Sequence, residues 1–122
     1  MNQYASEILD FWFNKSQPKQ WFEKNNEYDI LIKKKFLNYH NFAIQGKFES
    51  WKNLPYENLA LIILIDQFSR NIFRDNEKSY KYDSIALEVS KFGIKSEFLQ
   101  EFKDLNEKLF YILPLIHSEN IN

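Results

Sequence analysis

The sequence predicts an all-α domain of antiparallel helical hairpins, and three observations favour that class. Val occurs once and Thr is absent, so few of the residues that favour strands are present. Only two Gly and three Pro interrupt the chain. Apolar residues recur at helical spacing in about five stretches joined by short connections, which favour antiparallel neighbours. We expect residues 1–122 to form a single domain, because their number suits one hydrophobic core.

The first helix is expected at about residues 3–13, where apolar residues cover a broad face. Residues 14–20 are polar and contain Pro18, and they predict a loop. Trp21 and Phe22 then follow, and we expect them to fold a loop against the core.

The second helix is expected to begin near Asn26 and to end at Gly46. Asn26 is a plausible N-cap, and Asp29 stands three residues later, as in a capping box. The third helix should start at Pro55, a residue suited to a first helical turn. Its segment Leu59–Ile65 is apolar on all sides, which predicts a buried central helix.

Two further helices are expected, from about Asp83 to residue 92 and from about Asp104 to residue 116. Asp83 resembles an N-cap and Gly93 a stop signal. Pro114 should kink or break the last helix, because proline lacks the N–H that would bond to residue 110.

Composition excludes several classes of function. The net charge is −1, so the sequence lacks the basic character of a nucleic-acid-binding protein. No cysteine and only two His are present, and we expect neither a metal nor a cofactor. No basic-then-apolar signal peptide opens the chain, and no apolar stretch approaches the ~20 residues of a membrane span. The sequence therefore predicts a cytoplasmic protein that contacts no membrane.

A polar run at the end of the central helix is the strongest candidate site. The chain has fourteen Lys but only two Arg, and both Arg fall in one short segment as Arg70 and Arg74. Guanidinium is a planar fork that binds a carboxylate or phosphate through two parallel hydrogen bonds, which ammonium cannot do. Helical spacing places Asp66, Arg70 and Arg74 on one face, with Gln67 and Asn71 beside them.

Two interpretations of this run remain open. In the structural one, Asp66 pairs with Arg70, Arg74 caps helix carbonyls, and the amides bond to nearby backbone. In the functional one, both guanidiniums hold an anionic small molecule or a peptide carboxylate. Gln67 and Asn71 would then add directional hydrogen bonds to that ligand.

A second candidate cluster follows Pro114 and consists of His117, Ser118 and Glu119. His117 suits proton transfer near neutral pH, with Glu119 or Asp66 as a carboxylate partner or general base. Ser118 is counted among the candidate ligand-binding residues, and no nucleophile motif surrounds it. A lone His at a helix end is more often a cap or a surface residue, and His40 has still less claim to a function.

Several segments resemble landmarks of a bacterial family called domain of unknown function 924. They are Ile8–Phe13, Trp21–Phe22, Leu59–Ala60, Asp66–Arg74, Asp83 with Ala86–Leu87, and Leu113–Glu119. The resemblance implies an all-helical fold similar to tetratricopeptide-repeat proteins, and it implies no reaction. Ser69 stands where the family commonly has Pro, Asp75 where Gly is usual, and Asn120 where an acid is usual.

Members of that family typically continue into a second Arg- and His-rich motif that this chain lacks. The resemblance therefore implies that the domain is incomplete at its C-terminus. Three hypotheses follow: a domain that binds an anionic ligand or a partner, a hydrolase-like enzyme that uses Asp66, His117 and Glu119, and a truncated, partner-dependent fragment. A homo-oligomer or a partner chain that covers the C-terminal end would suit the third.

Overall fold

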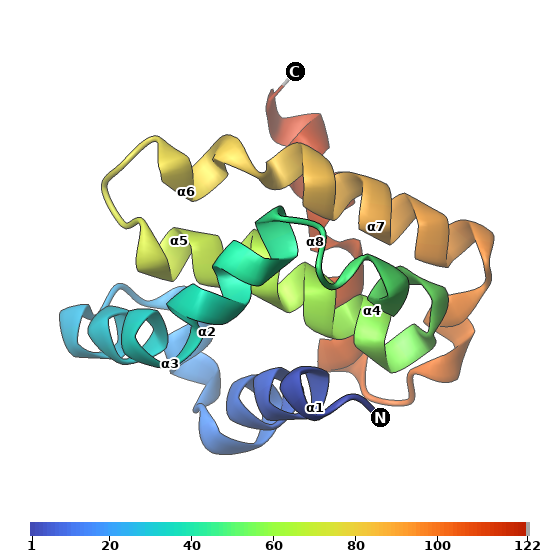
Figure 1. Cartoon of the computed structure of the whole chain (residues 1–122), viewed down its shortest axis with the longest axis horizontal. Helices are drawn as coiled ribbons and strands as arrows, with labels where there is room; N and C mark the ends of the chain where they lie inside the picture. The colour runs from blue at the N-terminus through green and yellow to red at the C-terminus, as the bar shows by residue number, and fades with distance from the viewer. Residues whose placement is uncertain (122) are drawn as a thin grey trace.

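The computed structural model describes residues 1–121, with side chains to Ser118, and shows an all-α chain (Figure 1). No strand occurs among these residues, so the predicted class is confirmed. The finer prediction of a tetratricopeptide-repeat-like stack stays a prediction. None of the helices in residues 1–121 combines the length and the apolar character that a bilayer crossing requires.

The described residues form α-helices interrupted by short π and 3₁₀ turns. In chain order these are α1 (Gln3–Leu9), η1 (Asp10–Lys15), α2 (Pro18–Phe22), α3 (Asn26–Ile44), η2 (Glu49–Asn53), α4 (Pro55–Ile62), η3 (Ile63–Gln67), α5 (Phe68–Ile72), α6 (Lys78–Lys81), α7 (Asp83–Lys95), η4 (Phe98–Glu101) and α8 (Leu105–Ile121).

The predicted central helix is the axis of the core. It consists of α4, η3 and α5 in succession, and every residue from Glu57 to Ser69 is buried. α1, α7 and α8 pack on α4, whereas α3 packs on α5 (Figure 1). Aromatic rings fill the spaces between these helices, and the largest fully buried ones belong to Trp12, Tyr111, Phe36, Phe68, Phe102 and Phe110. The apolar run therefore decides where the following polar residues lie.

The central helix is widened by one residue where the site begins. At η3 the N–H of Phe68 bonds to the carbonyl of Ile63, five residues back, which is the π pattern. A similar turn at η1 joins Ser16 to Phe11. The sequence predicts neither turn. At η3 the evenly apolar stretch before it hides a shift of one residue in helical phase.

The start of the second helix differs from the prediction. The N-cap is Asn25, whose side chain accepts a hydrogen bond from the N–H of Tyr28, and Asn26 is the first helical residue. Asp29 is buried and forms no capping box. The helix ends at Ile44, and Gly46 follows with φ of +83°, so the stop at glycine is confirmed. Residues 18–22 also differ, because Trp21 and Phe22 lie in the short helix α2 and not in a loop.

Gly93 is not a helix stop, since α7 continues through it to Lys95. It is buried, and a Cβ atom there would overlap the hydroxyl of Tyr111. Gly93 therefore allows α8 to approach α7 closely. α8 in turn runs through Pro114 to Ile121 without a break, contrary to the predicted end near residue 116.

We expect Gly93→Ala to destabilise the fold, although Ala is the better helix former by about 1 kcal/mol. The added methyl must displace the Tyr111 ring, and overpacking of this kind costs about 1–3 kcal/mol. Urea unfolding should give a lower midpoint for Gly93→Ala than for the wild type. Tyr111→Phe removes a buried hydroxyl that has no hydrogen-bond partner. The double variant should therefore recover part of the loss, and no recovery would contradict this packing account.

Candidate functional site

Asp66 is the centre of the candidate site and has no exposed surface. The apolar burial of α4 and the widened turn η3 together place its carboxylate inside the protein. Three donors compensate this buried charge: Nε2 of Gln67 at 2.8 Å, Nδ1 of His117 at 3.0 Å and Nη1 of Arg70 at 3.4 Å. A buried carboxylate requires such partners, because desolvation strongly penalises an isolated charge.

Arg70 joins Asp66 to a second carboxylate. Its Nη1 also donates to the backbone carbonyl of Asp66. Its fork faces Asp83 with two contacts, Nη1 to Oδ1 at 3.3 Å and Nη2 to Oδ2 at 3.2 Å. Burial raises the pKa of the Asp83 carboxyl, and the positive charge of Arg70 offsets only part of that effect. The ring of Tyr80 covers the guanidinium, with 5.1 Å between the ring centroid and Cζ of Arg70.

His117 comes from α8 and meets both Asp66 and Arg70 at its Nδ1 atom. The distances are 3.0 Å to Oδ1 of Asp66 and 3.2 Å to Nη2 of Arg70. Nδ1 of a neutral ring either donates to the carboxylate or accepts from the guanidinium. Asp66 is fully buried and gives the shorter contact, so we assign the proton to Nδ1. Nε2 is then left as the basic nitrogen of a side chain that is a quarter exposed.

Arg74 lies in a separate cluster and binds a different carboxylate from Arg70. Its Nε and Nη2 atoms donate to the two oxygens of Asp29, at 2.9 and 3.0 Å. Nδ2 of Asn71 donates to the same carboxylate at 2.9 Å. The hydrogen bonds with Asp29 raise the pKa of the Arg74 guanidinium. Together, the contacts of Arg74 and Asn71 with Asp29 link the start of α3 to the end of α5. Arg74 therefore caps no helix carbonyl through a described hydrogen bond.

Each guanidinium fork therefore already binds a carboxylate of the protein itself. Arg70 binds Asp83, and Arg74 binds Asp29. Sequence reasoning assigned both Asp residues to helix starts and missed this role. A capping acid and a buried ion-pair acid look alike in one sequence, because their partners lie 13 and 45 residues away. No local signal in the sequence separates the two roles.

A hollow of about 410 Å³ opens beside both guanidiniums. Arg70, Arg74 and Lys24 supply its positive charges, and Nζ of Lys24 lies 3.1 Å from Oδ2 of Asp75. The other lining residues are Asn76, Glu77, Ser79 and Tyr80. Asp75 has a φ of +64°, in the left-handed region that favours glycine. Gln67, Asn71 and His117 do not line this hollow, because they face Asp66 or Asp29.

The cluster after Pro114 is only partly described. His117 joins Asp66 as given above, and the partly buried Ser118 has an interaction of its own. The side chain of Glu119 lies outside the described part of the structure. Within the described side chains, no group of three or more His, Asp or Glu is arranged to hold a metal ion.

A buried His–Ser pair joins α3 to the polar run in α5. Nε2 of His40 on α3 lies 2.6 Å from Oγ of Ser69 on α5, and both side chains are buried. The rings of Phe73 and Tyr82 pack against the imidazole, at centroid distances of 5.4 and 5.2 Å. Burial lowers the pKa of His40 to about 4. His40 is therefore neutral at pH 7 and contributes to packing.

The fold and the site together define an all-α domain with a buried carboxylate–guanidinium–imidazole cluster. The family model for bacterial proteins of unknown function, DUF924, matches residues 8–122, so the chain belongs to that family. A solved structure of a protein of unknown function from Agrobacterium tumefaciens, ATU0120, is similar, with 31% identity and a TM-score of 0.84. The similarity covers 90% of this chain and 61% of that one. No curated protein matches.

We expect stability to fall as the pH drops below about 6.5. The unfolded chain binds a proton at His40 near its ordinary pKa of ~6.5, whereas the folded protein takes one up only near pH 4. Protonation thus favours the unfolded state within this window, by about 2 kcal/mol between pH 7.5 and pH 5. Urea unfolding at the two pH values measures this loss. His40→Gln, which cannot titrate, should lose less stability over the same range, and an identical loss would contradict the assignment to His40.

Proposed function

We propose that this protein binds a small phosphorylated or carboxylated ligand, or a peptide carboxylate, in the hollow beside Arg70 and Arg74. One observation supports this proposal most directly: the inner edges of both forks are held by protein carboxylates, while both side chains still line an open hollow. Nη1 of Arg74 donates to no described side chain, and the side chain is one-third exposed. Such a donor is oriented before the ligand arrives.

The charges around the hollow limit which ligand could bind. Asp29 and Asp83 neutralise much of the guanidinium charge, and Asp75 and Glu77 add two carboxylates to the lining, so a ligand would depend on the remaining directional donors and on Lys24. Lys24 is exposed, and its pair with Asp75 is of the surface type that contributes ~0–1 kcal/mol. A ligand phosphate or carboxylate could therefore replace Asp75 as the partner of Lys24 at little cost in free energy.

A second candidate function is proton transfer by His117, as in the hydrolase-like hypothesis. The 3.0 Å contact from Nδ1 to the buried Asp66 favours it, since a carboxylate there fixes the ring and leaves Nε2 to act as a base. Arg70, 3.2 Å from the same ring, would stabilise negative charge that develops nearby.

The expectation of a partner chain or second copy at the C-terminal end stays a prediction, as does a cytoplasmic location. Leu105 and Ile116 on α8 are the exposed apolar residues that such a partner would cover, with Leu105 80% exposed.

For the binding proposal, we expect inorganic phosphate or malonate to raise the melting temperature of the wild type. A ligand present at 100 times its Kd stabilises by about 2.7 kcal/mol, which amounts to several degrees in a domain of this size. Arg74→Lys and Lys24→Gln should each reduce the shift. The first removes the Arg74 fork, and the second removes the lysine cation of the hollow. Thermal unfolding at constant ionic strength gives the comparison.

Lys33→Gln, an exposed change on α3 outside the hollow, is the matched control and should keep the full shift. Phosphate also stabilises proteins by exclusion from their surface, so the difference between variants is the informative quantity. Equal shifts in the wild type, Arg74→Lys and Lys24→Gln would show that the Arg pairs only lock helices together.

For the second candidate, we expect ¹⁵N NMR to find neutral His117 protonated at Nδ1. Asp66 imposes this tautomer, so Asp66→Asn should shift the population toward the Nε2–H form that is usual in water. His117→Gln identifies the signal, since His40 is the other His of the chain. A wild-type ring protonated at Nε2 would mean that Nδ1 accepts from Arg70, and His117 would then lose its role as a base.

A further inference from the structure

A surface groove lies between η2 and α7, away from the candidate site. It has a volume of about 550 Å³. Ile85, Val89 and Phe92 form its apolar floor at positions i, i+4 and i+7 of α7, which lie on one helix face. Ile85 is 38% and Phe92 37% exposed, so part of this apolar face is open to water. Val89 itself is buried in the core, so the groove exposes the edge of the same apolar face that packs on α4 and α8.

The rim of the groove carries a small excess of positive charge. Lys52, Lys91 and Lys95 line it, against Glu49 and Glu88. Lys52 pairs with Glu49 and lies over the ring of Phe92, 5.7 Å from its centroid, so this pair is neutral. Lys91 and Lys95 then face one acid, Glu88.

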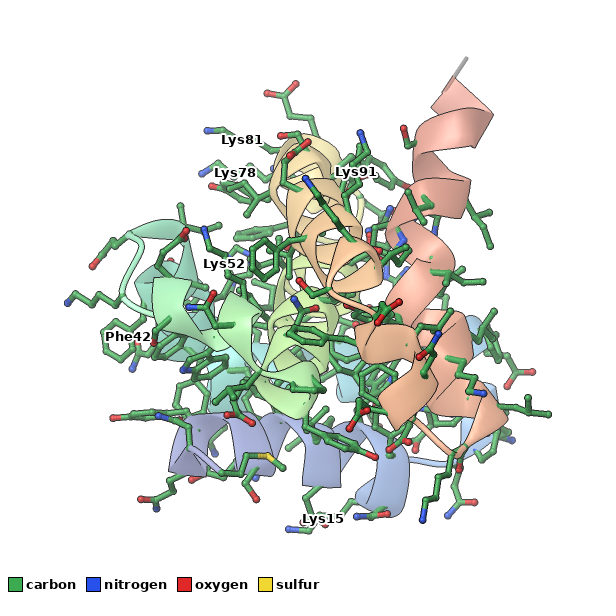
Figure 2. All side chains as sticks on the ribbon, turned by 90° about the vertical axis from the view of Figure 1, so that its right-hand side faces the viewer. Lys15, Phe42, Lys52, Lys78, Lys81 and Lys91 are labelled. Atoms are coloured by element: carbon green, nitrogen blue, oxygen red, sulfur yellow. The ribbon has the colours of Figure 1, made fainter. Side chains whose placement is uncertain are left out.

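The positive charge continues beyond the rim. Figure 2 shows Lys52, Lys78, Lys81 and Lys91 on the same side of the molecule, over α6, α7 and η2, whereas Lys15 lies at the opposite end. Asp75, Glu77 and Asp83 lie in the same stretch of chain, but Asp75 pairs with Lys24 and Asp83 with Arg70, so a small excess of lysine remains on this side. A partner for this surface therefore needs both an apolar stripe and acidic flanks.

We propose that the groove docks an acidic amphipathic helix of another protein. Its apolar residues would lie on Ile85, Val89 and Phe92, and its acidic side chains would meet Lys91 and Lys95. Ile85 and Phe92 are seven positions apart, about 10 Å along α7, which suits two to three turns of a partner helix. A nucleic acid would use the lysines but would leave Ile85 and Val89 of the floor without a matching surface. This inference does not depend on the anion-binding proposal.

The test measures binding of a labelled synthetic peptide to the full chain by fluorescence anisotropy. The peptide has about 14 residues, with leucines at helical i, i+4 and i+7 spacing and glutamates on both flanks. A second peptide has the same composition, but its leucines are distributed around the helix. We expect saturable binding of the first peptide and binding at least tenfold weaker for the second, a difference of about 1.4 kcal/mol.

Groove variants separate the apolar and the charged contributions. Lys91→Glu with Lys95→Glu should weaken binding at least tenfold, whereas Lys33→Glu with Lys34→Glu, on the exposed face of α3, should leave it unchanged. Phe92→Ala and, separately, Ile85→Ser should each weaken binding several-fold. Because Phe92 also contacts Phe98, Ile85→Ser keeps the apolar test valid if Phe92→Ala unfolds.

Three outcomes would overturn the proposal. The first is equal affinity for the two peptides, which would indicate attraction by charge alone. The second is tighter binding of a single-stranded oligothymidylate than of the amphipathic peptide, which would assign the lysines to nucleic acid. The third is binding that the groove variants do not change.

Discussion

The burial of the Asp66 carboxylate is the constraint around which the polar half of this domain is organised. A charge with no exposed surface is tolerated only where several donors surround it. Here those donors come from the turn itself through Gln67, from α5 through Arg70 and from α8 through His117. Arg70 in turn fixes Asp83 at the start of α7. One buried group therefore connects the central helix to both C-terminal helices.

The cluster of Arg74, Asp29 and Asn71 performs the same task on the other side of α5. It fixes the start of α3, while the His40–Ser69 pair fixes the C-terminal part of that helix. Arg70 and Arg74 thus bind different helices: Arg70 binds Asp83 of α7, and Arg74 binds Asp29 of α3. This division explains why lysine would not serve at either position: each fork binds both oxygens of its own carboxylate. It also leaves the outer edge of Arg74 as the part available to a ligand.

The sequence was most informative where a pattern has one physical outcome. The uninterrupted apolar run of residues 59–65 required burial, and that placed Asp66 and Arg70 near the core, as the structure confirms. Spacing of four residues also anticipated the contact between Asp66 and Arg70. These inferences depend on local geometry, which a single sequence specifies well.

Long-range partners were not predictable in this way. Asp29 and Asp83 resembled caps, and nothing local distinguishes a cap from an ion-pair partner on another helix. Gly93 resembled a stop because the Tyr111 ring that it accommodates comes from a later helix. Membership of the DUF924 family supports the fold, and the related structure from Agrobacterium tumefaciens is likewise of unknown function, so the chemistry rests on the site itself.

The π turn at η3 has a consequence for the phase of the central helix. A π turn completes one full rotation with one residue more than an α turn, so the helix that follows keeps its direction while the sequence advances by one residue. Within Ile63–Gln67 this extra residue lets the apolar face of α4 and the packing face of α5 both stay buried, although their sequence patterns are one residue out of step. Deletion of a single codon there would let the turn close as an ordinary α-helical turn, and the change would fall on the side chains of the turn itself, Asp66 and Gln67 among them.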